Sequence, residues 1–124
     1  MDNNKIALIY GFDEQEMESI SNFAEESHFP FIKIIKNTMG NMKISEILSG
    51  TELEVYNSSL PLEKVILFSN FNDDELNKAI QNIRQKFKPM PILAVVTETS
   101  MKWTFEKLLN HLIEEREWVR LHNR

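Results

Sequence analysis

The sequence predicts a small α/β domain whose open sheet has four mainly parallel strands in the order 2-1-3-4, with helices on both faces. Three observations predict this fold. Short apolar runs alternate with segments of helical periodicity, which is typical of a parallel sheet. The chain has 124 residues, the usual size of one domain, so we expect a single domain over 1–124. The pattern of the first half returns in the second, which indicates two β-α-β-α halves.

Three of the four expected strands are continuous apolar runs, as in strands that are buried on both faces of a sheet. These runs span residues 6–10, 65–68 and 92–96. Lys33 interrupts the fourth run, 31–36, so we place this strand at the rim, where charge discourages pairing with another chain. The expected order also leaves the apolar strand 92–96 at an edge, where a helix, a second subunit or the segment 53–56 would have to cover it.

The expected helices are amphipathic. Apolar residues recur with helical spacing over 17–24 and again over 76–87. A shorter helix is expected over 45–48 and ends at Gly50, which can adopt the left-handed conformation of a C-cap. The last and longest helix begins near Phe105. The segment 52–56 alternates charged and apolar residues, which suits a short fifth strand, and a loop is the alternative there.

An internal repeat relates the two halves, 5–48 and 64–109, and residues 110–124 extend the last helix beyond it. One constant offset aligns similar residues along both halves: Lys5 with Lys64, Leu8 with Leu67, Phe12 with Phe71, Glu16 with Glu75, Thr38 with Thr97 and Met42 with Met101. Strand sequences can converge on similar composition. Because the offset persists across two strands and reaches the second helix, we favour duplication.

The topology predicts where a ligand would bind. Crossovers between parallel strands are right-handed, so two such units wind outward from adjacent central strands, and the first and third strands meet at a switch point. Open α/β sheets bind ligands there, in the crevice at the carboxyl ends of the strands. The candidate crevice is formed by Tyr10, Gly11, Phe12 and Asp13, facing Ser69, Asn70, Phe71 and Asn72.

The same residues also fit a structural role at the start of two helices. Asp13 and Asn72 are good N-caps, and a glutamate stands three residues after each, as in a capping box. Phe12 and Phe71 precede these caps and have an apolar residue five positions later, the spacing of a hydrophobic staple. We favour this interpretation over a duplicated ligand loop.

Composition excludes several classes of function. The formal net charge is -5, and Lys and Arg are not concentrated on one element, so we expect no nucleic-acid partner. Without cysteine the chain has no disulfide, thiolate nucleophile or zinc finger. The N-terminus lacks a basic region followed by an apolar stretch, and the apolar runs are too short to cross a membrane. We expect a cytoplasmic protein without a membrane partner.

No catalytic residue, cofactor or metal ligand set is predicted. The phosphate loops GxGxxG and GxxxxGK[ST] do not occur, and the strand ends lack the acidic residues and the lysine of a receiver-type phosphoacceptor. His111 and Glu115 lie four residues apart on one helix face, but no third ligand accompanies them. We therefore expect no metal.

Trp118 is the candidate interface residue. It falls on the helix face of His111 and Glu115, away from the apolar stripe, and large exposed aromatic residues mark interfaces. We expect a homodimer or a protein partner there. The alternative is that the Trp118 ring folds back onto the sheet.

The strand that ends in Tyr10-Gly11-Phe12 and the segment Thr97-x-Thr99-x-x-x-Trp103-Thr104, with the helix that follows it, resemble a bacterial family described as a domain of unknown function. The resemblance covers most of the chain and implies no activity. It adds Thr97, Thr99 and Trp103 to the candidate ligand crevice, together with Thr104. The alternative role for Thr99 is a hydrogen bond within its loop.

Two functions are compatible with these features. The leading hypothesis is a non-catalytic binding or protein-interaction module with a regulatory role, because the scaffold carries no convergent acid, base or nucleophile. The alternative is a small-molecule or anion-binding domain, either a binding protein or an enzyme, which uses the crevice at the carboxyl ends of strands 1 and 3.

Overall fold

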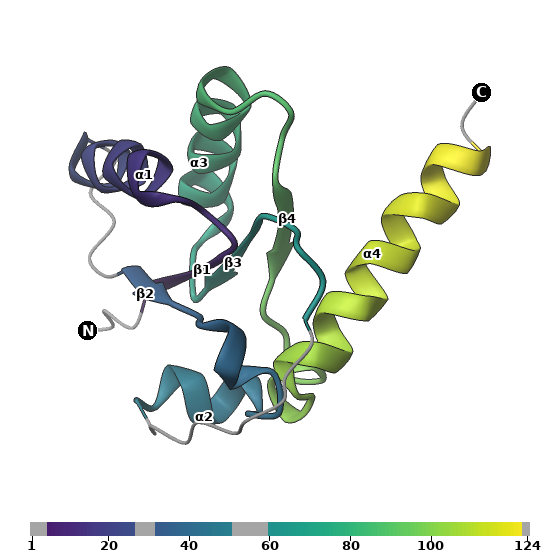
Figure 1. Cartoon of the computed structure of the whole chain (residues 1–124). Coiled ribbons are helices and arrows are strands. Elements are labelled where there is room, and N and C mark those ends of the chain that lie inside the picture. The colour runs from purple at the N-terminus through teal and green to yellow at the C-terminus, as the bar shows by residue number, and fades with distance from the viewer. Residues whose placement is uncertain (1–4, 27–31, 51–59, 123–124) are drawn as a thin grey trace. The chain divides into compact units, whose positions relative to one another are not determined.

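The computed structural model describes residues 5–26, 32–50 and 60–122 (Figure 1). These residues form two compact units, each built from two chain segments. We call the first the sheet unit, which lies within Met1–Ile35 and Glu63–Val96, and the second the helical unit, which lies within Lys36–Leu62 and Thr97–Arg124. The single domain over 1–124 stays a prediction, and the proposed strand at 52–56 lies outside the described residues.

The sheet unit contains four strands in the predicted order β2-β1-β3-β4. They are β1 (Ile6–Tyr10), β2 (Ile32–Ile34), β3 (Val65–Ser69) and β4 (Ile92–Val95). Two of the pairings are parallel, β1 with β2 and β3 with β4, so the prediction of a mainly parallel sheet is confirmed. Every residue of β3 is buried, as its continuous apolar run predicts.

The central pairing differs from the expected one, because β1 and β3 run antiparallel. Leu8 lies opposite Leu67 at the centre of the register, and these two residues are aligned with each other in the proposed repeat. The two halves of the sheet are therefore related by a rotation about an axis through this pair. The expected parallel contact of the first and third strands is wrong. The apolar pattern of a strand that is buried on both faces is the same in both chain directions. The composition of the strand therefore does not predict whether it pairs parallel or antiparallel. The duplication itself stays a prediction.

Helices α1 (Glu14–Glu26) and α3 (Asp73–Lys86) pack on the same face of this sheet (Figure 1). The core joins side chains of both helices to strand residues that point to one side: Ile20, Ala79 and Ile83 with Ala7, Ile9, Ile66 and Phe68. Right-handed crossovers on either side of an antiparallel central pair place both helices on one face. A parallel central pair would have placed them on opposite faces.

The helical unit contains η1 (Asn37–Met39), α2 (Ile44–Leu48), η2 (Ser100–Lys102) and α4 (Phe105–His122). An antiparallel bridge between Lys43 and Thr104 joins its two segments, and the Ile44 amide donates to the Trp103 carbonyl at 2.9 Å. The predicted short helix before Gly50 and the long last helix are both confirmed. No helix within the described ranges combines the length and the apolar character that crossing a membrane requires.

Candidate functional site

The two halves of the predicted crevice lie at opposite ends of the sheet. Tyr10, the last residue of β1, pairs with Val65, the first residue of β3, whereas Ser69 at the end of β3 pairs with Ile6. Gly11, Phe12 and Asp13 therefore leave the sheet at one end, and Asn70, Phe71 and Asn72 leave it at the other. The expected crevice between the carboxyl ends of strands 1 and 3 is wrong, because it required a parallel central pair.

The helix-starting role of these residues is confirmed. The Glu16 amide donates to Asp13 Oδ1 at 2.8 Å, and the Asp13 amide donates to Glu16 Oε1 at 2.9 Å. Asn72 and Glu75 make the same reciprocal pair, with both distances 2.9 Å. Both helices of the sheet unit thus begin with a complete capping box.

The aromatic residues beside the caps belong to the core. Phe12 and Phe71 are both half-buried and pack against the central cluster. The Phe12 ring meets Phe87 edge-on at a centroid distance of 5.8 Å, and Phe71 meets Phe68 in the same way at 5.2 Å. These rings anchor the chain where it enters each helix.

The residues that directly follow the two strands have left-handed backbones. Gly11 has φ of 90°, and Asn70, its partner in the repeat, has φ of 66°. A Cβ on Gly11 would collide with the Glu63 carbonyl oxygen, so the chain approaches too closely there for any side chain. Gly11 has a structural role. The neighbouring Tyr10 is buried, and burial raises the pKa of its hydroxyl.

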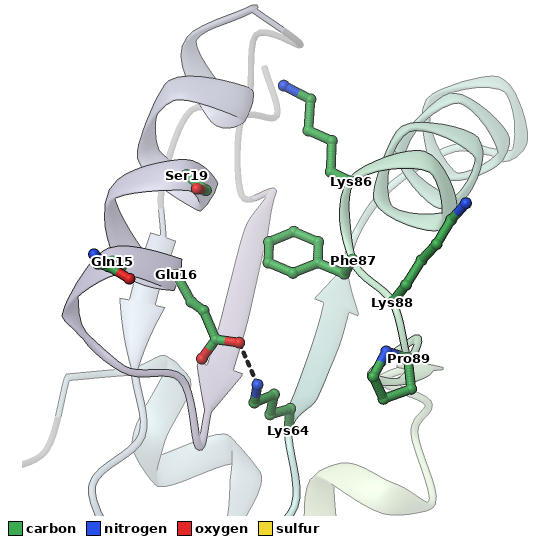
Figure 2. Close-up of a pocket in the computed structure, with 8 residues that line it drawn as sticks. All are labelled: Gln15, Glu16, Ser19, Lys64, Lys86, Phe87, Lys88 and Pro89. Atoms are coloured by element: carbon green, nitrogen blue, oxygen red, sulfur yellow. Dashed lines mark hydrogen bonds and ion pairs between the residues drawn. The ribbon is translucent and has the colours of Figure 1, made fainter.

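A pocket of about 270 Å³ opens at the start of α1, and we call it the lysine pocket (Figure 2). Three cationic side chains line it, from Lys64, Lys86 and Lys88. The other lining residues are Gln15, Glu16, Ser19, Phe87 and Pro89. All eight belong to the sheet unit. Figure 2 shows the Phe87 ring between α1 and the segment that carries Lys86 and Lys88, as an apolar wall in a polar pocket.

The two carboxylate oxygens of Glu16 make different contacts in this pocket. Its Oε1 atom accepts from the Asp13 amide, and its Oε2 atom forms an ion pair with the Lys64 ammonium. The Lys64 side chain is 46% exposed and that of Glu16 is 22% exposed, so the capped carboxylate is the more firmly held partner. Lys64 reaches α1 because the antiparallel register places the start of β3 beside the end of β1.

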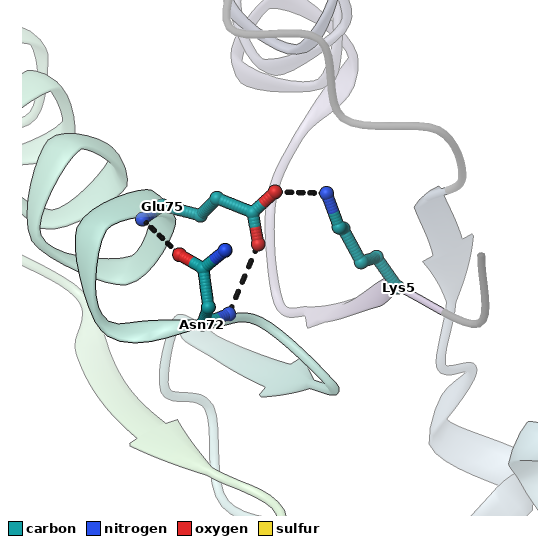
Figure 3. A network of polar contacts seen from close by, with 3 residues as sticks. All are labelled: Lys5, Asn72 and Glu75. Carbon is teal, nitrogen blue, oxygen red and sulfur yellow. Dashed lines mark hydrogen bonds and ion pairs between the residues drawn. The ribbon is translucent and has the colours of Figure 1, made fainter. Parts of the chain in front are cut away.

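The equivalent ion pair at the other end of the sheet joins Lys5 to Glu75 (Figure 3). In the repeat, Lys5 is the partner of Lys64 and Glu75 is the partner of Glu16. The hydrogen bond from Lys5, together with the one from the Asn72 amide, holds the pKa of the Glu75 carboxyl below its usual value.

The four candidates from the family resemblance, Thr97, Thr99, Trp103 and Thr104, lie in the helical unit. Thr97 and Ser100 form a local turn in which the Thr97 amide donates to Ser100 Oγ at 2.9 Å and the Ser100 amide donates to Thr97 Oγ1 at 3.1 Å. Thr99 precedes η2 without a capping side-chain hydrogen bond. The Trp103 ring is half-buried; it meets His111 edge-on at 5.3 Å, and the Lys107 ammonium lies 4.6 Å from its centroid. These contacts fix the start of α4.

Trp118 remains exposed. Its accessible fraction is 60%, and its ring stacks on His122 with a centroid distance of 4.1 Å. The alternative in which this ring becomes buried is wrong. Val119 and Leu121 beside it are exposed as well, by 49% and 66%. The role of Trp118 as an interface stays a prediction.

The lysines of the pocket are not among the site residues that the sequence predicts. Lys64 was visible as the repeat partner of Lys5, but its contact with Glu16 depends on the antiparallel pairing. Lys86 and Lys88 flank Phe87 at the end of a helix, where basic residues are common because they complement the helix dipole. The sequence did contain one indication that these two lysines are special. The offset of the proposed repeat aligns them with the uncharged Ser27 and Phe29, so the first half has no counterpart of their charge.

Comparison with known proteins finds a similarity to one family within the second half of the chain. Residues 64–119 match the family model described as Domain of unknown function (DUF3783). The match confirms the resemblance over these residues, which include Thr97, Thr99 and Trp103. The part of the resemblance that rests on Tyr10-Gly11-Phe12, and the bacterial origin, stay predictions. Neither a curated protein nor a solved structure matches the chain. Within the described ranges no group of three or more His, Asp and Glu side chains is placed to hold a metal ion.

Proposed function

Because residues 64–119 match a family whose description names no activity, we propose a function from the geometry. The chain is a non-catalytic binding domain, and its lysine pocket takes a small organic anion. One observation carries this proposal. Three lysines and one glutamate line a pocket, which gives it a net positive charge in a chain whose net charge is -5. Local charge opposite to that of the whole molecule attracts anions.

The other lining residues suit the two ends of such a ligand. Gln15 and Ser19 lie in the first two turns of α1, near the positive end of its dipole, and both can donate hydrogen bonds. Phe87 and Pro89 offer apolar surface to a ring or a short chain. Lys86 and Lys88 are exposed, so their long side chains can turn toward a bound anion.

The disposition of Glu16 supports binding without catalysis. Among the eight residues that line the pocket, Glu16 is the one carboxylate. Its two oxygens are engaged by the Asp13 amide and the Lys64 ammonium. A carboxylate held in this way caps a helix and neutralises a lysine, and a general base needs an oxygen that can reach the substrate.

Isothermal titration calorimetry at low ionic strength tests the proposal with phenyl phosphate and benzoate, and with the neutral benzyl alcohol as a blank. We expect at least one anion to bind, and K86A/K88A to weaken that binding about tenfold, as the loss of two partly exposed charges predicts. The control K78A/K102A removes two exposed lysines outside the pocket and should bind like the wild type. Absence of anion binding, or equal weakening in both double variants, would contradict the proposal.

A second proposal is protein interaction through the end of α4, in particular the formation of a homodimer. It is supported by the exposure of Trp118, Val119 and Leu121 on the last turns of this helix. Light scattering at micromolar concentration should then give a mass above 14.6 kDa, and W118S/L121S should return the monomer. A wild-type species of 14.6 kDa alone would exclude the homodimer under these conditions.

A further inference from the structure

We infer that the lysine pocket selects a phosphoryl dianion, and that Glu16 competes with this ligand for the Lys64 ammonium. The inference rests on the proposed function and assigns to it a ligand class and an internal competitor. It follows from the charge of the lining and from the two separate contacts of the Glu16 carboxylate.

The charge of the lining matches a dianion. Lys64, Lys86 and Lys88 with Glu16 leave a net charge of two positive units. A phosphate monoester carries about −1.5 to −2 charges at pH 7 and three acceptor oxygens, whereas a carboxylate carries one charge and two oxygens. Attraction scales with the charge of the ligand, so a phosphoryl group gains more than a carboxylate from the same three lysines.

Glu16 already forms an ion pair with one of these cations, the Lys64 ammonium. The Asp13 amide holds Glu16 Oε1 at 2.9 Å, which fixes the carboxylate at the start of α1. The Lys64 side chain is about half exposed, so its ammonium can move from Glu16 to a ligand. An entering anion must share Lys64 with Glu16 and is repelled by the fixed carboxylate. Glu16 therefore lowers the affinity of the pocket.

The chain supplies its own control for this inference. Lys5 and Glu75 repeat the ion pair at the other end of the sheet, and Asn72 repeats the cap. The counterparts of Lys86 and Lys88 in the sequence are Ser27 and Phe29, which carry no positive charge. A substitution at Glu75 therefore changes an equivalent ion pair and capping box without altering the lysine pocket.

The test is calorimetric titration of the full chain with phenyl phosphate and benzoate at pH 7.5, on the wild type, Glu16→Gln and Glu75→Gln. Gln at this position of a capping box keeps the acceptor oxygen, so the cap survives and the charge is lost. We expect E16Q to bind phenyl phosphate at least threefold more tightly than the wild type and E75Q to bind it equally. Wild-type binding of benzoate should be about tenfold weaker than that of phenyl phosphate, for a charge difference of one unit.

A second pair of variants covers the case in which E16Q does not fold. Lys64→Gln removes the contested cation and exposes the Glu16 charge to the ligand, so it should weaken binding of phenyl phosphate at least threefold. Lys5→Gln should leave binding unchanged. Circular dichroism of each variant verifies the fold.

The outcomes separate the inference from the proposed function. A folded E16Q that binds no more tightly than the wild type overturns the competition, and so does K64Q binding equal to that of K5Q. Equal affinity for benzoate and phenyl phosphate overturns the dianion class. In these cases lysine-dependent anion binding, and with it the proposed function, still stands. Loss of any difference between K86A/K88A and the wild type overturns the proposed function itself.

Discussion

The two ends of the central sheet use the same kinds of contact and differ in the charge beside them. At each end a strand is followed by a left-handed residue, an aromatic anchor, an N-cap and a glutamate that pairs with a lysine from the other half. The end at α1 also carries Lys86 and Lys88 beside a pocket, and the sequence counterparts of these two lysines are uncharged. The caps, aromatic anchors and ion pairs are thus common to both ends, whereas Lys86 and Lys88 are found at one end alone.

The contacts that occur at both ends and those that occur at one end have different explanations. Caps, staples and ion pairs that occur at both ends are explained by the need to start a helix and to join two halves. The positive charge of the lysine pocket occurs at one end alone. The need to start a helix and to join the two halves therefore does not explain it. Substitutions at the two ends test whether the shared contacts are equivalent and whether the added lysines act alone.

The largest effect is expected at the left-handed residues that follow the two strands, Gly11 and Asn70. Gly11→Ala drives a Cβ into the Glu63 carbonyl oxygen on a backbone with φ of 90°, so we expect a loss of about 2–4 kcal/mol in the free energy of unfolding. Asn70→Ala adds no new Cβ, because asparagine already has one. It should lower the free energy of unfolding by about 1 kcal/mol, because alanine adopts a left-handed backbone less readily than asparagine. Urea denaturation measures both, and equal losses would mean that the close approach at Gly11 is relieved easily.

Much of this comparison could be predicted from the sequence. The strands, both capping boxes and the aromatic anchors depend on short-range patterns, and each appears where its pattern placed it. The direction of β3 could not be predicted, because Val65 to Phe68 is apolar throughout and fits either orientation. The lysine pocket depends on that direction, since only the antiparallel register brings Lys64 to Glu16.

The two caps should contribute equally. Asp13→Ala and Asn72→Ala each remove the acceptor of one helix-terminal amide, so we expect each to cost about 1 kcal/mol. Thermal or urea unfolding of the two variants measures the difference between them. A cost at one end more than twice that at the other would show that the two helix starts are not equivalent.

The smallest effect concerns the dependence of stability on pH. The pKa of Glu75 lies below its usual value in the folded chain, so the unfolded chain binds more protons at acid pH, and stability falls as the pH drops. The contribution of Glu75 is fully present above the ordinary pKa of about 4.5 and is lost as the pH falls through the lowered value. The stability difference between the wild type and Glu75→Gln should therefore shrink below pH 4.5. A difference independent of pH would refute the ion pair with Lys5.

The most direct test of the account is a titration of the ¹⁵N-labelled chain with phenyl phosphate, followed by amide chemical shifts. The account predicts saturable shifts at Gln15, Ser19 and Phe87, smaller ones at residues 70–75, and loss of the shifts in K86A/K88A. Equal shifts at the two ends of the sheet, or none at the lysine pocket, would contradict it.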